Sequence, residues 1–102
     1  MPLHSSNKRE TTMRQFIIER NIPGASTLSA QELKEISQKS CQVVEDLNEP
    51  YKWITSYVAG DKIYCIHEAD SAETIRKHAE MGGFPADMVT EIAGVIGPQT
   101  AT

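Results

Sequence analysis

Residues 51–68 read YKWITSYVAGDKIYCIHE, and this stretch decides the fold. Its two parts, Tyr51–Ala59 and residues 62–68, are rich in β-branched and aromatic residues that nearly alternate with polar ones, which is typical of strands. Gly60 and Asp61 between them form a linker short enough for a hairpin turn. The stretch therefore predicts two antiparallel strands in the middle of the chain.

Upstream of this hairpin, the pattern predicts one strand followed by one helix. Residues 13–20 (MRQFIIER) contain a short apolar run and indicate a buried strand, and the Pro-Gly pair that follows signals a turn. Ser29 and Glu32 have the spacing of a capping box. Apolar residues then recur at helical spacing, which predicts a helix that extends to about Asn48.

Downstream of the hairpin, the same order of elements is repeated. Asp70 and Glu73 have capping spacing, and they predict a second helix over residues 71–81. Two consecutive glycines then favour the end of that helix, because glycine adopts the left-handed conformation without a steric penalty. Residues 88–96 predict a fourth strand, which a glycine weakens in the middle.

The order β-α-β followed by β-α-β predicts an α+β fold of the ferredoxin-like kind. Right-handed crossovers give a four-stranded antiparallel sheet with both helices on one face and the first and third strands in the centre. We expect residues 1–12 to be a flexible leader, 13–97 the domain and 98–102 a frayed tail. Because Trp53 or Tyr57 would lie on the uncovered sheet face, we expect two sheets to meet in a dimeric α/β barrel.

The composition argues against two classes of partner. The formal net charge is −4 and no long basic run is present, which disfavours nucleic-acid binding. No apolar stretch approaches the ~20 residues that span a bilayer, so we expect no membrane partner. Cys41 and Cys65 form neither a Cys-x-x-Cys pair nor a disulfide framework, so we expect a reducing, cytoplasmic setting.

The chain has no recognised catalytic motif, and four side chains are candidate metal ligands. Cys65 and His67 lie two apart on a strand and point to one face, where thiolate and imidazole suit zinc or nickel. His78 faces the sheet from the second helix, and Glu19 closes the first strand, beside the third. The alternatives are a core cysteine, hydrogen-bonded core or rim histidines and a solvated carboxylate.

Five further residues are candidates for a pocket that takes an organic molecule. Trp53, Tyr57 and Tyr64 can line such a pocket with flat aromatic surface. Glu68 closes the third predicted strand and Glu91 lies within the fourth, and both are further pocket candidates. Packing in a core or in a dimer interface is the alternative for the aromatic residues.

Several segments together resemble a known family. They are residues 16–20 (FIIER), 22–24 (IPG), 56–58 (SYV), 61–65 (DKIYC), 75–80 (IRKHAE), 82–87 (GGFPAD) and 91–92 (EI). They resemble a bacterial family of small ferredoxin-like proteins, formerly a domain of unknown function and now often called nickel-binding protein. The resemblance spans roughly residues 13–97 and implies a dimeric α/β barrel that binds nickel. His78, Cys65 and Glu91 fall within the matching segments.

Three functional hypotheses follow. The first is a non-enzymatic, intracellular homodimer that binds nickel or another divalent metal through His67, His78, Cys65 and Glu19. The second is a small-molecule-binding enzyme of the dimeric α/β-barrel kind, monooxygenase- or isomerase-like, in which a cleft histidine serves as acid or base. The third is a dimerisation or partner-binding module whose interior is filled by side chains.

Overall fold

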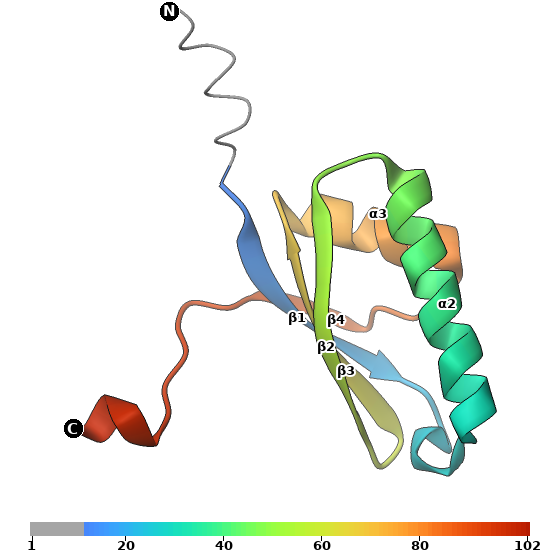
Figure 1. The fold of residues 1–102 in the computed structure, drawn as a ribbon, viewed down its shortest axis with the longest axis horizontal. Helices are drawn as coiled ribbons and strands as arrows, with labels where there is room; N and C mark the ends of the chain where they lie inside the picture. The colour runs from blue at the N-terminus through green and yellow to red at the C-terminus, as the bar shows by residue number, and fades with distance from the viewer. Residues whose placement is uncertain (1–11) are drawn as a thin grey trace, which may run out of the picture.

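The computed structural model describes residues 12–102, so the predicted leader, apart from residue 12, lies outside the described part. The elements follow the predicted order, with a short 3-10 helix added after the first strand and another at the end (Figure 1). They are β1 (Arg14–Asn21), η1 (Ala25–Thr27), α2 (Ala30–Leu47), β2 (Tyr51–Ala59), β3 (Lys62–Ala69), α3 (Ala72–Gly82), β4 (Met88–Glu91) and η2 (Pro98–Ala101).

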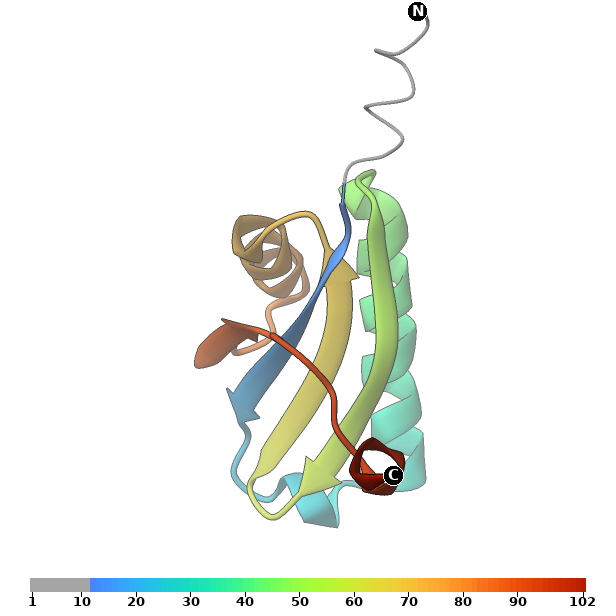
Figure 2. The ribbon, with the colours of Figure 1, turned by 90° about the vertical axis from the view of Figure 1, so that its left-hand side faces the viewer.

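The four strands form one sheet in the order β2-β3-β1-β4, with every neighbouring pair antiparallel. The first and third strands are therefore central, as the sequence predicts. Both helices lie on the same side of the sheet, and the other side is open (Figures 1 and 2). The predicted ferredoxin-like α+β fold is confirmed.

The helix ends show which sequence signals act as caps. At the start of α2, Glu32 N donates to Ser29 Oγ (3.0 Å) and Ser29 N donates to the Glu32 carboxylate (2.8 Å), so the predicted capping box is confirmed. At the start of α3 the N-cap is Ser71 rather than Asp70, because the Ser71 hydroxyl accepts from Thr74 N (3.2 Å). The Asp70 carboxylate instead accepts from the Thr74 hydroxyl (2.7 Å).

The core lies between the sheet and the two helices. In β3, every second residue is buried on the helix-covered side. In β1, Phe16, Ile18 and Arg20 are buried on the same side. Strict alternation therefore separates the two faces of these strands. Ile18 of β1 and Ile75 of α3 are completely buried at the centre of this layer. The buried core cluster comprises Phe16, Ile18, Ala25, Ile63, Cys65, Ala69 and Ile75.

Strand β2 breaks this alternation with a β-bulge. Trp53 and Thr55 pair with consecutive residues of β3, and Ile54 between them has no partner in the ladder. The extra residue reverses the phase of the strand, so Trp53 and Ser56 both face the helices. Tyr57 then falls on the open face. The expectation that Trp53 shares the open face with Tyr57 is therefore wrong for Trp53.

Strand β4 is shorter than predicted, since it ends at Glu91 and not at residue 96. Its partner β1 begins at Arg14, and Glu91 pairs with Phe16, which is only two residues from the start of β1. One further hydrogen bond, from Ile92 N to Gln15 O (2.8 Å), continues the contact. Beyond it the chain has no strand to pair with among the described residues, so the apolar pattern cannot form a ladder.

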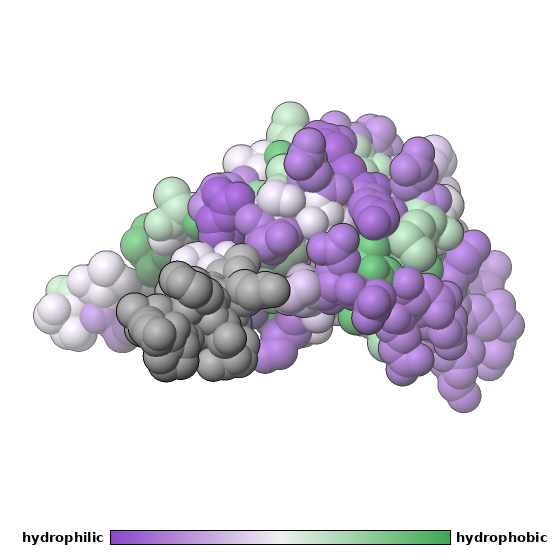
Figure 3. All heavy atoms as spheres, turned by 90° about the horizontal axis from the view of Figure 1, so that it is seen from above, coloured by the Kyte–Doolittle hydropathy of each residue, from purple (hydrophilic) through white to green (hydrophobic). Residues whose placement is uncertain are grey.

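Residues 92–97 instead form an extended segment on the open side of the sheet. The segment stands off from the strands (Figure 1) and runs across the sheet toward the β2 edge (Figure 2). It ends in the 3-10 helix Pro98–Ala101, where a frayed tail was expected. Seen from above, hydrophobic residues show between the C-terminal tip and the rest of the molecule, and hydrophilic residues predominate on the side of the helices (Figure 3).

Candidate functional site

A cavity of about 510 Å³ lies between α2 and the sheet. It exists because α2 packs closely only through its second half, where Val43 and Leu47 are buried, whereas Leu33 and Ile36 in the first half stay half-buried. The volume is in the range typical of small-molecule sites. The lining residues are Arg20, Ile22, Leu33, Ile36, Ser37, Ser40, Trp53, Ile54, Thr55, Ser56, Val58, Ile63, Cys65, His67 and Phe84.

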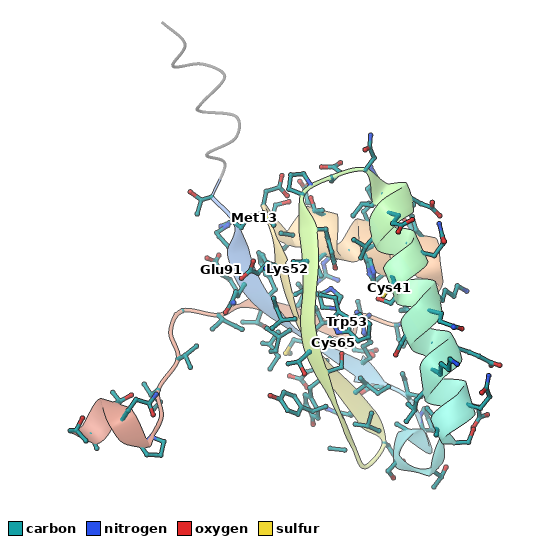
Figure 4. All side chains as sticks on the ribbon, in the orientation of Figure 1. Met13, Cys41, Lys52, Trp53, Cys65 and Glu91 are labelled. Atoms are coloured by element: carbon teal, nitrogen blue, oxygen red, sulfur yellow. The ribbon has the colours of Figure 1, made fainter. Side chains whose placement is uncertain are left out.

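One wall of the cavity carries a chain of hydrogen bonds centred on Cys65. Trp53 Nε1 donates to Ser56 Oγ (2.9 Å), and the Ser56 hydroxyl donates to Cys65 Sγ (3.0 Å). Arg20 Nε also donates to the same sulfur (3.3 Å). Figure 4 shows Trp53 on the α2 side of β2 and Lys52, its neighbour, on the other side. The bulge in β2 makes this chain possible because it turns both Trp53 and Ser56 toward the cavity.

Arg20 places a positive charge inside the protein. Its side chain lies on the covered face of β1, and the residue is only 5% exposed. Nη1 donates to the carbonyl oxygen of Pro85 (2.7 Å), and the guanidinium lies 5.5 Å from the centroid of the Phe84 ring. Each ion pair found within residues 12–102 involves other cations, so no carboxylate in that range neutralises Arg20.

Three aromatic rings meet beside the cavity. Tyr51 stacks on His78 with 4.8 Å between the ring centroids, and His67 lies edge-on to both rings at 5.2 Å. The Tyr51 hydroxyl is hydrogen-bonded to His67 Nδ1. His67 lines the cavity, whereas His78 lies behind it.

Both histidines are held in the neutral form. Burial, followed by the nearby His78 and Arg20, lowers the pKa of His67 to about 3. Burial is also the main cause that lowers the pKa of His78, against a hydrogen bond to Ser40 that raises it. Burial raises the pKa of Tyr51, so its hydroxyl keeps its proton at neutral pH.

One ring nitrogen of His78 has no partner among residues 12–102. The other, Nε2, lies 3.3 Å from the hydroxyl oxygen and 3.4 Å from the carbonyl oxygen of Ser40. Because the carbonyl can only accept, we assign the ring proton to Nε2, which then donates to it. Nδ1 then holds a lone pair, and it is buried with no hydrogen-bond partner among the described residues. An unsatisfied buried polar atom is rare, and a catalytic role or a bound water or ion is among its common explanations.

The predicted metal ligands are only partly brought together. His67 and His78 are in contact and Cys65 lies on the same wall, whereas Glu19 pairs with Tyr64 and faces the open side of the sheet. Glu19 was expected near His67, but β1 and β3 are antiparallel, so their C-terminal ends lie at opposite ends of the sheet. Within residues 12–102 no group of three or more His, Cys, Asp or Glu side chains could hold a metal ion.

These donors fit nickel in kind, although one chain does not complete a site. Neutral imidazole is a preferred ligand for nickel, and the unpartnered Nδ1 of His78 offers a free lone pair. His67 Nδ1 is hydrogen-bonded to the Tyr51 hydroxyl, and with the ring proton on Nδ1 the lone pair of His67 lies on Nε2. Two imidazoles that suit nickel are therefore in contact.

The predicted pocket residues are divided between two sides of the sheet. Trp53 lines the cavity. Tyr57 and Tyr64 are cross-strand partners on the open face, where Glu68 also lies. Glu91 forms an exposed ion pair at the edge of the sheet.

Sequence reasoning missed Arg20 as a member of the site. The signal was present, because Phe16, Ile18 and Arg20 are spaced two apart and therefore share one face of β1. A charged residue at the end of a predicted strand normally extends into solvent. For this reason Arg20 was not assigned to the buried face, although its spacing from Phe16 and Ile18 places it there.

The strand order and the two helices on one face define the chain as a ferredoxin-like α+β protein. The sequence model of the nickel responsive protein SCO4226-like family matches residues 16–92, and the chain belongs to this family. The resemblance drawn from the sequence is confirmed.

A solved structure supports the same assignment. The crystal structure of SCO4226 from Streptomyces coelicolor A3(2) is similar to this chain with a TM-score of 0.66 and 25% sequence identity. The similarity covers 80% of this chain and 99% of that one. A comparison with curated proteins found no match. No helix within residues 12–102 is long and apolar enough to cross a membrane.

Proposed function

We propose that this protein is an intracellular homodimer that binds nickel or another divalent cation. Membership of a nickel responsive family supports the choice of metal. The observation that carries the proposal is the contact between two buried, neutral imidazoles, His67 and His78, one of which has an unpartnered nitrogen. Neutral imidazole is the form that coordinates a metal.

His78 Nδ1 and His67 Nε2 are the nitrogens that would hold the cation. Cys65 shares the wall with His67 and is the nearest candidate for a sulfur ligand, because the two residues are two apart on β3. Ligands beyond these three have to come from water, from a second molecule in the cavity or from the partner chain. A bound cation would satisfy the lone pair that the fold leaves open in His78.

Isothermal titration calorimetry of the tag-free protein with nickel, zinc and cobalt tests this proposal, together with thermal melting under the same conditions. We expect stoichiometric nickel binding and a rise in Tm, because a ligand of the folded state stabilises it by about 2.7 kcal/mol at 100 times Kd. His67→Gln and His78→Gln should each weaken binding. Glu19→Gln, on the other face, is the matched control. Absence of binding in the unmodified protein would refute the proposal.

The open face of the sheet supports the homodimer. Ile17 and Ile66 form a half-buried cross-strand pair at its centre. Tyr57 and Met88 beside them are 61% and 52% exposed, so the face carries apolar surface that a second sheet could cover. A two-fold pairing of this face buries the same residues on both chains.

The C-terminal segment supports the same assembly. Val95 and Ile96 are 78% and 83% exposed, although they lie in an ordered extended segment on the open side of the sheet. A second copy seated on the sheet would lie between the strands and this segment and would cover both residues. Light scattering after size exclusion should show a dimer, and Val95→Ser with Ile96→Ser should weaken it on dilution. A monomer at all concentrations would contradict this part of the proposal.

The cavity itself favours a second candidate function, the binding of a small molecule. Its volume of about 510 Å³ far exceeds that of a single ion, and most of its lining is apolar. Acid–base catalysis by His67 is less well supported, because a pKa of about 3 leaves no proton to donate at neutral pH. We therefore propose a binding role for this cavity rather than the predicted acid–base role. Titration with small organic molecules, described next, tests it.

A further inference from the structure

We propose that the cavity binds a small organic monocarboxylate, with the carboxylate held by Arg20 and the apolar body lying against α2. This inference rests on the second candidate function, small-molecule binding, and it does not depend on nickel. It identifies the chemical class of the ligand by the charge and the shape of the cavity.

The first argument is the charge of Arg20. The guanidinium is always protonated, and the residue is buried on the covered face of β1. A buried charge is unfavourable unless a counter-charge compensates it, and no carboxylate within residues 12–102 forms an ion pair with it. Its partners are the carbonyl oxygen of Pro85 and the sulfur of Cys65. An anion in the cavity would supply the missing charge.

The second argument is the number of charges. The cavity lining contains no Asp, Glu or Lys, so Arg20 is the one permanently charged side chain among the residues that line it. A carboxylate carries one negative charge and matches it, with two oxygens suited to a guanidinium. A phosphate group carries about −1.5 to −2 at pH 7 and would remain undercompensated.

The third argument is the apolar surface that lines the rest of the cavity. Leu33 and Ile36 of α2 and Ile22, Ile63 and Phe84 give the cavity apolar walls. Such walls favour an aliphatic or aromatic body and disfavour a fully polar molecule. The ligand is therefore an acid with an apolar tail, such as a medium-chain or aryl carboxylate.

The experiment compares hexanoate and phenylacetate with hexanamide and inorganic phosphate, in the presence of a metal chelator. Binding is measured by NMR chemical-shift titration and by thermal melting. We expect both carboxylates to bind and to raise Tm, and the amide and phosphate to bind at least about tenfold more weakly, because each lacks the matched charge. Equal binding of hexanoate and hexanamide, or no binding by either carboxylate, would overturn the proposal.

Variants locate the site. Arg20→Gln should weaken hexanoate binding at least about tenfold, whereas Arg14→Gln, an exposed arginine on the same strand, should leave it unchanged. Because Arg20→Gln alters a buried position, Ile36→Trp provides a second test: it fills the cavity from the half-buried side of α2 and should also abolish binding. Unchanged affinity in both cavity variants would refute the site. Nickel titrations of the same variants in chelator-free buffer separate this result from the proposed metal binding.

Discussion

The two faces of the sheet are built from the same strands and differ in how their polar groups are satisfied. On the helix-covered face, and within residues 12–102, Arg20 forms no ion pair with an acidic residue and one ring nitrogen of His78 has no hydrogen-bond partner. On the open face, Glu19 pairs with Lys62 and Glu68 accepts from Gln15. Surface polar groups find partners or water, whereas the covered face retains unsatisfied ones, which places the candidate site there.

The largest expected difference between the faces is in stability. Ile18→Ala should lower the free energy of unfolding by about 2–5 kcal/mol, because the side chain is fully buried and leaves a cavity. Ile17→Ala, one residue earlier on the open face, should cost less, since Ile17 is only half-buried. Urea denaturation measures both values. Equal losses would show that the open face is as fully covered in solution as the core.

The next effect is the dependence of stability on pH. The pKa of His67 is about 3 in the folded protein and about 6.5 in the unfolded chain, so its stabilising contribution is complete above pH 6.5. It is lost as the pH falls from 6.5 toward 3, with a slope of up to about 1.4 kcal/mol per pH unit. His78 contributes in the same direction. Urea denaturation at pH 7, 6 and 5 measures this slope.

A matched variant assigns the acid sensitivity to the covered face. His67→Phe should reduce the slope between pH 6.5 and 5, because the unfolded chain then gains one proton fewer. Tyr57→Phe on the open face should leave it unchanged. An unaltered slope in His67→Phe would show that other groups cause the acid sensitivity.

A smaller difference in stability is expected between two aromatic residues of β2, Trp53 on the covered face and Tyr57 on the open face. Trp53→Phe should cost about 1–2 kcal/mol, because it removes the hydrogen bond to Ser56 and part of the cavity wall. Tyr57→Phe, on the open face, should remain within about 0.5 kcal/mol. Equal effects in thermal melting would contradict the different environments of these two aromatic residues.

The smallest effect is expected for a polar pair on the open face. Glu68→Gln replaces the carboxylate that accepts from Gln15 Nε2 (2.9 Å), and stability should change by less than about 1 kcal/mol. Because a second copy is proposed to cover this face, the loss should grow on dilution. A change that is independent of protein concentration would place the pair outside the dimer interface.

Most of the fold could be predicted because local signals agree with it. Alternation fixes the faces of β1 and β3, the Ser29–Glu32 box fixes the start of α2, and a two-residue turn fixes the hairpin. The end of β4 could not be predicted from its own residues, because a strand also needs a partner. β1 begins at Arg14, so the length of β4 is limited by where its partner strand begins, in a distant part of the sequence.

The site was harder to predict because it depends on phase and direction. A bulge is not visible in the residue pattern, so Trp53 and Tyr57 were expected on one face. Glu19 was expected near His67, because both close their strands, yet the strands run in opposite directions. His67 and Cys65 were correctly expected on one face, since β3 has no irregularity between them.

The bulge also gives one position unusual freedom to vary. Ile54 belongs to no ladder pair, yet its side chain lines the cavity and is 43% exposed. A substitution there changes the lining of the cavity without altering any cross-strand pair of the ladder. The size of this one side chain can therefore change the space that a ligand finds in the cavity, while the sheet beneath stays the same.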